Sequence, residues 1–216
     1  VIRIDYENQT AFDLALKEKL KENLLTAAAD ADAIIVSDYN YGVASAELAT
    51  AAKKIAAAKK IPLLVDSRYR LRDFTGATSA TPNQEEAEQI LGKKFTEAEN
   101  FTEACAELRE TLGYESLLVT RGNKGMLLIE SGKPPVALDA VGAKEPVDVT
   151  GAGDTVIATY ALGLACGLSF AEAARLANHA GGIVVMKKGT ASVSPEELIA
   201  SVGGMQTNAG AADRRR

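Results

Sequence analysis

The stretch from Asp148 to Asp154 combines a polar turn, two glycines and a carboxylate directly ahead of an apolar run. The apolar run favours a helix, which places Gly151, Ala152 and Gly153 at its N-terminal turn. The first backbone N–H groups of a helix lack intrahelical partners and carry partial positive charge, and glycines let an anion approach them closely. We therefore expect this turn to stabilise a transferring phosphoryl group, with Asp154 as the base that accepts a proton from the attacking hydroxyl.

The same residues also fit a simpler interpretation, in which the glycines form an ordinary turn and Asp154 interacts favourably with the helix dipole. Two common phosphate-binding motifs are excluded. A Walker A loop requires Gly-Lys-Ser/Thr, which does not follow here, and Val156 stands where a dinucleotide-binding fingerprint has its third glycine. The turn by itself leaves a catalytic and a structural role open.

Two further motifs have residue types suited to a nucleotide and its metal. Asn83-x-x-Glu86 stands at a predicted helix start, where its oxygen atoms either orient Mg²⁺ through water or simply cap the helix. Thr120-x-Gly122-x-x-Gly125 follows a predicted strand and either wraps a nucleotide with backbone groups or forms only a turn between strands.

Other polar positions carry weaker signals. Gly189, after a long predicted helix, is either a second nucleotide-side turn or a helix C-cap. His179 is the only histidine, which rules out a multi-histidine metal site, and we expect it to be a packed or partly exposed side chain rather than a catalytic one. The basic segment with Arg68, Arg70 and Arg72 either meets an anionic group of a ligand or is a solvated loop.

The elements that must position these residues alternate between strands and helices. Apolar runs predict strands at 33–37, 61–66, 77–80 and 117–120, helices at 45–60, 84–91, 101–112 and 170–186, and a hairpin of 126–130 with 136–141. This order predicts an α/β fold with a mostly parallel sheet covered by helices on both faces. Ligands bind at the C-terminal ends of such strands, so Asp38, Asp66, Asn83 and Thr120 should converge on one rim.

Composition restricts the class of protein. The 216 residues include 47% apolar and 25% charged residues with a net charge of −5, which is ordinary for a globular domain and argues against nucleic acid as a partner. No apolar run reaches the length of a membrane span, so we expect no membrane association and a cytoplasmic location. Cys105 and Cys166 lie far apart in Ala-rich helical contexts, and we expect both to be buried thiols.

The motifs become specific when they are taken together. Asn83-x-x-Glu86, Thr120-x-Gly122-x-x-Gly125, the segment from Asp148 to Asp154 and Asn178 occur in one order along the chain. In this order the sequence resembles the ribokinase-like (PfkB) family of sugar kinases, from about residue 34 to 199. Within the family it is most similar to the heptose-7-phosphate kinase domain of the bifunctional enzyme that makes ADP-heptose, through Ser37-Asp38-Tyr39, Thr81-Pro82-Asn83 and Val193-Ser194-Pro195.

The resemblance implies an ATP-dependent transfer of the γ-phosphate to a sugar hydroxyl, with a sugar or sugar phosphate as acceptor. Asp154 would be the base, and Gly151, Ala152 and Gly153 the anion hole. The implied roles elsewhere are nucleotide binding for Asn83, Thr120, Gly122, Gly125 and Asn178, Mg²⁺ binding through water for Asn83 and Glu86, and a monovalent cation such as K⁺ at Asp148, Thr150 and Gly189. The resemblance also admits a homodimer.

The sequence departs from the family in two ways. The N-terminal strands, with their Gly-Gly sugar-binding segment and β lid, are not visible, so we expect residues 1–202 to form an N-terminally incomplete kinase domain. Tyr41 stands in Asn40-Tyr41-Gly42, where the heptose kinases tend to have a lysine before the glycine. These departures leave open a catalytically silent nucleotide- or sugar-binding fragment, or a kinase for another sugar or a nucleoside. Residues 203–216 are rich in Gly and Ala and are expected to be a disordered tail.

Overall fold

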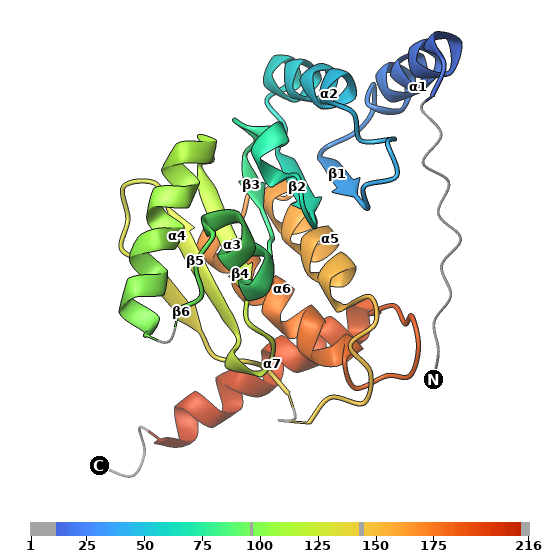
Figure 1. The fold of residues 1–216 in the computed structure, drawn as a ribbon. Helices are drawn as coiled ribbons and strands as arrows, with labels where there is room; N and C mark the ends of the chain where they lie inside the picture. The colour runs from blue at the N-terminus through green and yellow to red at the C-terminus, as the bar shows by residue number, and fades with distance from the viewer. Residues whose placement is uncertain (1–11, 96, 143–144, 213–216) are drawn as a thin grey trace.

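A computed structural model describes residues 12–95, 97–142 and 145–212, and its elements alternate as the apolar pattern predicts (Figure 1). The helices are α1 (Leu14–Ala27), α2 (Ala46–Lys59), α3 (Gln84–Leu91), α4 (Ala98–Leu112), α5 (Ala152–Ala165), α6 (Phe170–Val184) and α7 (Pro195–Ala212), with short 3₁₀ turns at Leu71–Phe74 and Gly122–Lys124. The strands are β1 (Ile34–Asp38), β2 (Leu63–Ser67), β3 (Ser79–Ala80), β4 (Ser116–Thr120), β5 (Met126–Glu130) and β6 (Val136–Leu138).

These strands form one sheet in the order β1-β2-β3-β4-β5-β6. The pairs from β1 to β4 are parallel, whereas β4–β5 and β5–β6 are antiparallel, which confirms the prediction of a mostly parallel sheet with an antiparallel hairpin. Asn83 also lies beside Thr120 in an isolated parallel bridge. The ends of neighbouring strands therefore meet at one rim, as parallel pairing requires.

Alternating side chains divide the core between the two faces of the sheet. Leu63 and Val65 of β2 belong to a buried cluster that includes α2, α3 and α4, whereas Leu64 between them belongs to a second cluster formed with α5 and α6. Leu117 and Leu118 of β4 alternate in the same way, and Figure 1 shows the two helical layers on opposite faces. Strands buried on both faces explain why their sequences are continuous apolar runs.

The α5–α6 pair approaches closely because small residues line its contact. A Cβ atom at Gly163 would lie 3.0 Å from the Cβ of Ala173, and a Cβ at Gly181 would lie 3.1 Å from a methyl group of Val156. Ala173, like its neighbours on that face of α6, is fully buried. The close packing fixes the start of α5 relative to α6.

Two expectations about side-chain packing hold and one is wrong. His179 is buried on α6, where its Nδ1 lies 2.7 Å from the hydroxyl of Ser201 on α7, so it is a packed side chain as expected. Cys105 is buried as predicted. Cys166 is exposed, which contradicts the prediction, because it caps the C-terminus of α5 where the chain turns at Gly167.

The ends of the chain also differ from the expectations. α7 continues as a helix through Ala212, although disorder was predicted from Gly203, because the Ala-rich sequence beyond Gly204 contains no proline to stop it. The N-terminal helix begins at Leu14 after an Asp13 cap and contains no buried residue. The alternating sequence Val1-Ile2-Arg3-Ile4-Asp5 is typical of the end of a strand, and it lies outside the described residues. Within the described part of the chain, no helix has the length and apolar character that crossing a membrane requires.

Gly125, between β4 and β5, and Gly132, between β5 and β6, provide a matched test of backbone packing. Gly125 has φ +80°, and a Cβ there would collide with the carbonyl oxygen of Leu138, whereas Gly132 has φ +70° and open space around it. Gly132→Ala should lower the free energy of unfolding by about 1 kcal/mol through left-handed strain alone. Gly125→Ala should cost at least about 2 kcal/mol more, because overpacking adds to that strain. Urea unfolding of both variants checks this difference, and equal losses would contradict the described contact.

Candidate active site

The N-terminus of α5 lacks the side-chain cap that begins α1, α2, α3 and α6. Gly151 occupies the N-cap position with φ 77°, a left-handed conformation suited to glycine. Among the described residues, the backbone N–H groups of Gly153 and Asp154 have no hydrogen-bond acceptor. Unpartnered N–H groups at a helix N-terminus form an anion-binding site, so this turn is free to hold a phosphoryl group.

Asp154 lies in the first turn of α5, exposed to solvent, and contacts a residue from the other end of the chain. The hydroxyl of Tyr39, directly after β1, donates a hydrogen bond of 2.8 Å to its Oδ1. That hydrogen bond to the carboxylate raises the pKa of Tyr39 above its ordinary value of 10.0. The contact orients the carboxylate and leaves its second oxygen open to a hydroxyl.

A cavity opens beside Asp154, and we call it the carboxylate cavity. Its volume is about 300 Å³, and it is lined by Asp38, Asp66, Glu86, Asp154, Tyr39, Arg68 and neighbouring residues of the strand ends. The predicted convergence of polar residues on one rim is therefore confirmed for Asp38, Asp66, Asn83 and Thr120, all of which line it. The carboxylates enter from four separate segments of the chain.

The carboxylates differ in their surroundings. Asp38 is buried, and both of its carboxylate oxygens are hydrogen-bonded. They accept from the hydroxyl of Ser67 at 2.8 Å and from the backbone N–H of Asn40 at 2.9 Å. Within the part of the chain that the structure describes, Asp66 has no such hydrogen-bond donor. Burial first, and then the negative charges of Glu86 and Asp154, raise its pKa from the ordinary 3.8 to about 6. Strongly perturbed carboxylates in a cleft are typical of functional sites.

Asn83 and Glu86 form a capping box at the start of α3. The Oδ1 of Asn83 accepts from the backbone N–H of Glu86, and the Oε2 of Glu86 accepts from the backbone N–H of Asn83, both at 2.9 Å. The capping role is thus confirmed. Burial also raises the pKa of Glu86, whose carboxylate lines the carboxylate cavity.

The described residues contain no cluster of three or more His, Cys, Asp or Glu side chains able to hold a metal. Mg²⁺ in phosphate-transferring sites needs only one or two carboxylates, because water and substrate phosphates supply its other ligands. Glu86, with Asn83 beside it in the carboxylate cavity, fits that requirement.

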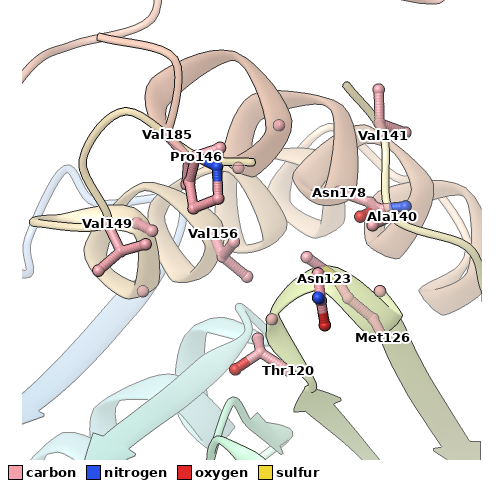
Figure 2. A pocket seen from close by; sticks show the side chains of 16 residues that line it. Thr120, Asn123, Met126, Ala140, Val141, Pro146, Val149, Val156, Asn178 and Val185 are labelled. Carbon is pink, nitrogen blue, oxygen red and sulfur yellow. The ribbon is translucent and has the colours of Figure 1, made fainter. Parts of the chain in front are cut away.

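A second, mostly apolar cavity of about 210 Å³ lies between the β4–β5 connection and the α5–α6 pair (Figure 2). We call it the glycine-lined cavity, since Gly122, Gly125, Gly153, Gly181 and Gly182 form much of its wall. Thr120 projects into it from the end of β4 and Val156 from the opposite side, as Figure 2 shows. Its apolar walls suit a flat ring system such as a nucleobase.

Most of the residues predicted to bind a nucleotide line this cavity, namely Thr120, Gly122, Gly125 and Asn178. The amide of Asn178 donates 2.7 Å to the carbonyl of Asp139 and so fixes the segment after β6. Asn83 does not line it and belongs to the carboxylate cavity instead.

Three residues lie at the junction of the two cavities, since Thr120, Val149 and Gly153 line both. A group held by the N–H groups of the α5 turn is therefore accessible from either side. This arrangement allows one ligand in the glycine-lined cavity to pass a group to a second ligand beside Asp154.

The residues suggested for a monovalent cation are also brought together. Asp148 accepts hydrogen bonds of 2.9 Å from the backbone N–H groups of Thr150 and Gly189. Hydrogen bonds from the Thr150 side chain and then from these N–H groups hold the pKa of Asp148 below its ordinary value. Asp148 thereby ties the loop before α5 to the loop after α6, and the main-chain oxygens of these loops are the groups that would hold such a cation.

The three arginines after β2 have different surroundings. The guanidinium of Arg70 bonds the carboxylate of Asp73 and the carbonyl of Ala44, and that of Arg72 bonds the carbonyl of Ile90. Arg68 lies in the carboxylate cavity with its guanidinium 5.4 Å from the centre of the Tyr39 ring.

Sequence reasoning did not assign a site role to Tyr39 or Asp66. Asp66 was expected on the rim because it follows a buried strand, and Tyr39 carried only the signal of the Ser37-Asp38-Tyr39 motif. The contact of Tyr39 with Asp154 spans 115 residues of chain, so no local pattern could indicate it.

Solved structures with this fold include kinases. The chain matches ribokinase from Arabidopsis thaliana, solved with ribose and ATP, with a TM-score of 0.69 and 22% identity over 89% of this chain and 60% of that one. It matches phosphofructokinase-2 from Escherichia coli, solved with potassium, with a TM-score of 0.77 and 21% identity over 91% of this chain and 64% of that one. At these identities the likeness shows the fold, which is ribokinase-like as predicted.

Curated relatives share much more sequence. The bifunctional protein HldE of Citrifermentans bemidjiense is 40% identical over 204 residues, which cover 94% of this chain and 42% of that protein. The HldE of Hahella chejuensis is 42% identical over 199 residues, which cover 92% of this chain and 40% of that protein. The chain thus spans about two fifths of the length of these relatives.

The family itself is shown by a match over most of the sequence. The family model described as pfkB family carbohydrate kinase matches residues 3–197, a range that contains every residue of the two cavities. The predicted motif order, the ribokinase-like sheet and the HldE relatives agree with that match. The chain therefore belongs to the pfkB family of carbohydrate kinases.

Proposed function

We propose that the protein containing this chain transfers the γ-phosphate of ATP to a hydroxyl of a sugar phosphate, with the anomeric hydroxyl of D-glycero-D-manno-heptose 7-phosphate as the acceptor. The observation that carries the proposal is the uncapped turn of α5, with Asp154 beside it, at the junction of two cavities. The identity with the HldE relatives supports a heptose phosphate as acceptor.

Different residues bind ATP, the acceptor and the metal ions. ATP lies in the glycine-lined cavity along Thr120, Gly122 and Gly125, and its γ-phosphate meets the N–H groups of the α5 turn. The acceptor lies in the carboxylate cavity with one hydroxyl at Asp154. Mg²⁺, held through water by Asn83 and Glu86, would neutralise phosphate charge, and K⁺ near Asp148 would support the turn.

The step itself is a single displacement. The acceptor hydroxyl gives its proton to Asp154 while its oxygen forms a bond to the γ-phosphorus. The bond from that phosphorus to the bridging oxygen breaks, and ADP leaves with the electron pair. The N–H groups of Gly153 and Asp154 face the oxygens whose charge is redistributed, and their fixed orientation lowers the barrier without reorganisation.

A second candidate is a catalytically silent nucleotide- or sugar-binding fragment, favoured by the chain's coverage of only 60–64% of the two kinase structures compared above. Phosphate transfer assayed on this chain and on the full-length protein separates the two functions. Turnover by the full-length protein alone means that further segments are needed to complete the acceptor site.

Asp154→Asn in the full-length protein should lower kcat by at least about 10³-fold, because the acceptor loses its base. The dissociation constant for ATP should change less than about twofold, since ATP lies in the other cavity. Kinetics of ADP release and calorimetric titration with ATP measure these quantities. Asp30→Asn, at an exposed position outside both cavities, is the control for loss of one charge. Near-wild-type turnover of Asp154→Asn would reject Asp154 as the base.

The proposed site also predicts a pH-dependent cost to stability at Asp66. Because its pKa is about 6 in the folded protein and ordinarily 3.8, the folded state binds the proton more tightly, and stability is lost as pH rises from about 4 to 6. Asp66→Asn removes this titration. Its free energy of unfolding relative to wild type should therefore increase across that window, by at most about 3 kcal/mol.

Denaturant unfolding of Asp66→Asn and wild type at pH 4, 5, 6 and 7 measures this difference, and other titrating groups cancel in the comparison. Asp32→Asn, an exposed carboxylate elsewhere, serves as the control. A difference that stays constant from pH 4 to 7 would show that burial and the nearby charges do not act on Asp66 as described.

A further inference from the structure

The carboxylate cavity has an unbalanced charge. Asp38, Asp66, Glu86 and Asp154 line it, and Arg68 is the one lysine or arginine among its described lining residues. A phosphorylated acceptor entering this cavity meets repulsion from these carboxylates unless a cation offsets it. Whether a phosphorylated acceptor can bind here therefore depends on whether the guanidinium of Arg68 is free to contact its phosphate.

Arg68 differs from Arg70 and Arg72 because its guanidinium is available to bind a ligand. Arg70 and Arg72 hold the segment after β2 in place through hydrogen bonds to backbone carbonyls, and Arg70 also lies 3.8 Å from Asp38. Within the described part of the chain, the guanidinium of Arg68 makes no hydrogen bond or salt bridge, and its side chain is exposed. Its five N–H donors are free to bind an anion.

The position of Arg68 relative to the base is set by Tyr39. The guanidinium lies 5.4 Å from the centre of the Tyr39 ring, and the hydroxyl of the same ring donates to Asp154 at 2.8 Å. One aromatic ring therefore separates the cation from the base. An acceptor whose hydroxyl reaches Asp154 and whose phosphate is several atoms away along the sugar chain can contact both.

We propose that Arg68 binds the phosphate group of a phosphorylated acceptor and so makes the enzyme specific for sugar phosphates over free sugars. The proposal rests on the proposed kinase function and assigns the acceptor class at that same site. In the absence of acceptor, the guanidinium of Arg68 lies over the ring of Tyr39, which is a weak interaction at an exposed site. A bidentate contact of arginine with phosphate is stronger, so the phosphate replaces the ring as its partner.

The transferring γ-phosphate is a less suitable partner for Arg68. Thr120, Val149 and Gly153 line both cavities and mark the place of transfer, whereas Arg68 and Tyr39 line only the carboxylate cavity. The N–H groups of Gly153 and Asp154, which have no acceptor among the described residues, belong to the turn at that junction. Arg68 is therefore placed on the acceptor side of the reaction.

Arg68→Gln in the full-length protein tests the proposal, with two pairs of probes: heptose 7-phosphate and free heptose, and mannose 6-phosphate and mannose. Calorimetry gives the dissociation constants, and steady-state kinetics give KM and kcat. For wild type we expect tighter binding of each phosphorylated probe. Arg68→Gln should weaken binding of the phosphorylated probes at least tenfold, leave the free sugars and ATP within twofold, and change kcat little. Arg68→Lys should give an intermediate loss.

Arg72→Gln is the matched control, since it removes an arginine of the same segment that bonds the carbonyl of Ile90 outside the cavity. Circular dichroism verifies that both variants fold. Equal losses for phosphorylated and free sugars would show that Arg68 does not recognise the acceptor's phosphate. A fall in kcat with unchanged acceptor binding would assign Arg68 to the transferring phosphoryl group. Either result would overturn the proposal. Unchanged binding, or a wild-type protein with no preference for phosphorylated probes, would also overturn it.

These results remain separable from the kinase function itself. Phosphate transfer that depends on Asp154 but is indifferent to Arg68 leaves the kinase function standing and removes only the specificity role. Phosphate-selective binding that depends on Arg68, without transfer to any acceptor, would support the specificity role and reject the kinase function.

Discussion

The unpartnered backbone N–H groups at the start of α5 are the interaction on which the rest of the site depends. Helices in this protein are otherwise commonly closed by a side chain, as Ser45, Asn83 and Ser169 show. A missing cap costs on the order of 1 kcal/mol. At α5 the N-cap is Gly151 with a positive φ, and the turn lies at the junction of two cavities, where an anion can take the place of the cap.

The surrounding structure holds that turn at a fixed place. Small residues bring α5 against α6, and Asp148 joins the loop before α5 to the loop after α6. Tyr39 then connects the first turn of α5 to the end of β1. Two loops, two helices and a strand end thus converge on one turn, which suits a reaction whose catalysis rests mainly on positioning and charge stabilisation.

Gathering carboxylates around this turn opposes stability. Asp66 is half-buried near Glu86 and Asp154, and among the described residues it lacks the hydrogen bonds that Asp38 receives; its raised pKa reflects that cost. Arg68 offsets part of the negative charge, while its stacking on Tyr39 keeps it extended in the cavity. A site with excess negative charge and one available cation is selective about which anions it admits, since both the repulsion and its relief are local.

The sequence alone determined the features that depend on neighbouring residues: the period of the apolar pattern, the buried strands, the cap at Asn83 and the glycine turn before α5. Local propensity and hydrogen bonding decide these, so the α/β fold and the location of the glycine turn were predictable. Only the tertiary structure decided which residues meet. The Tyr39–Asp154 bond, the burial of Asp66, the exposure of Cys166, the place of Asn83 in the carboxylate cavity and the separation of Arg68 from Arg70 and Arg72 all depend on long-range packing. Packing sets exposure, dielectric surroundings and the distances between distant segments, and no local pattern encodes these quantities.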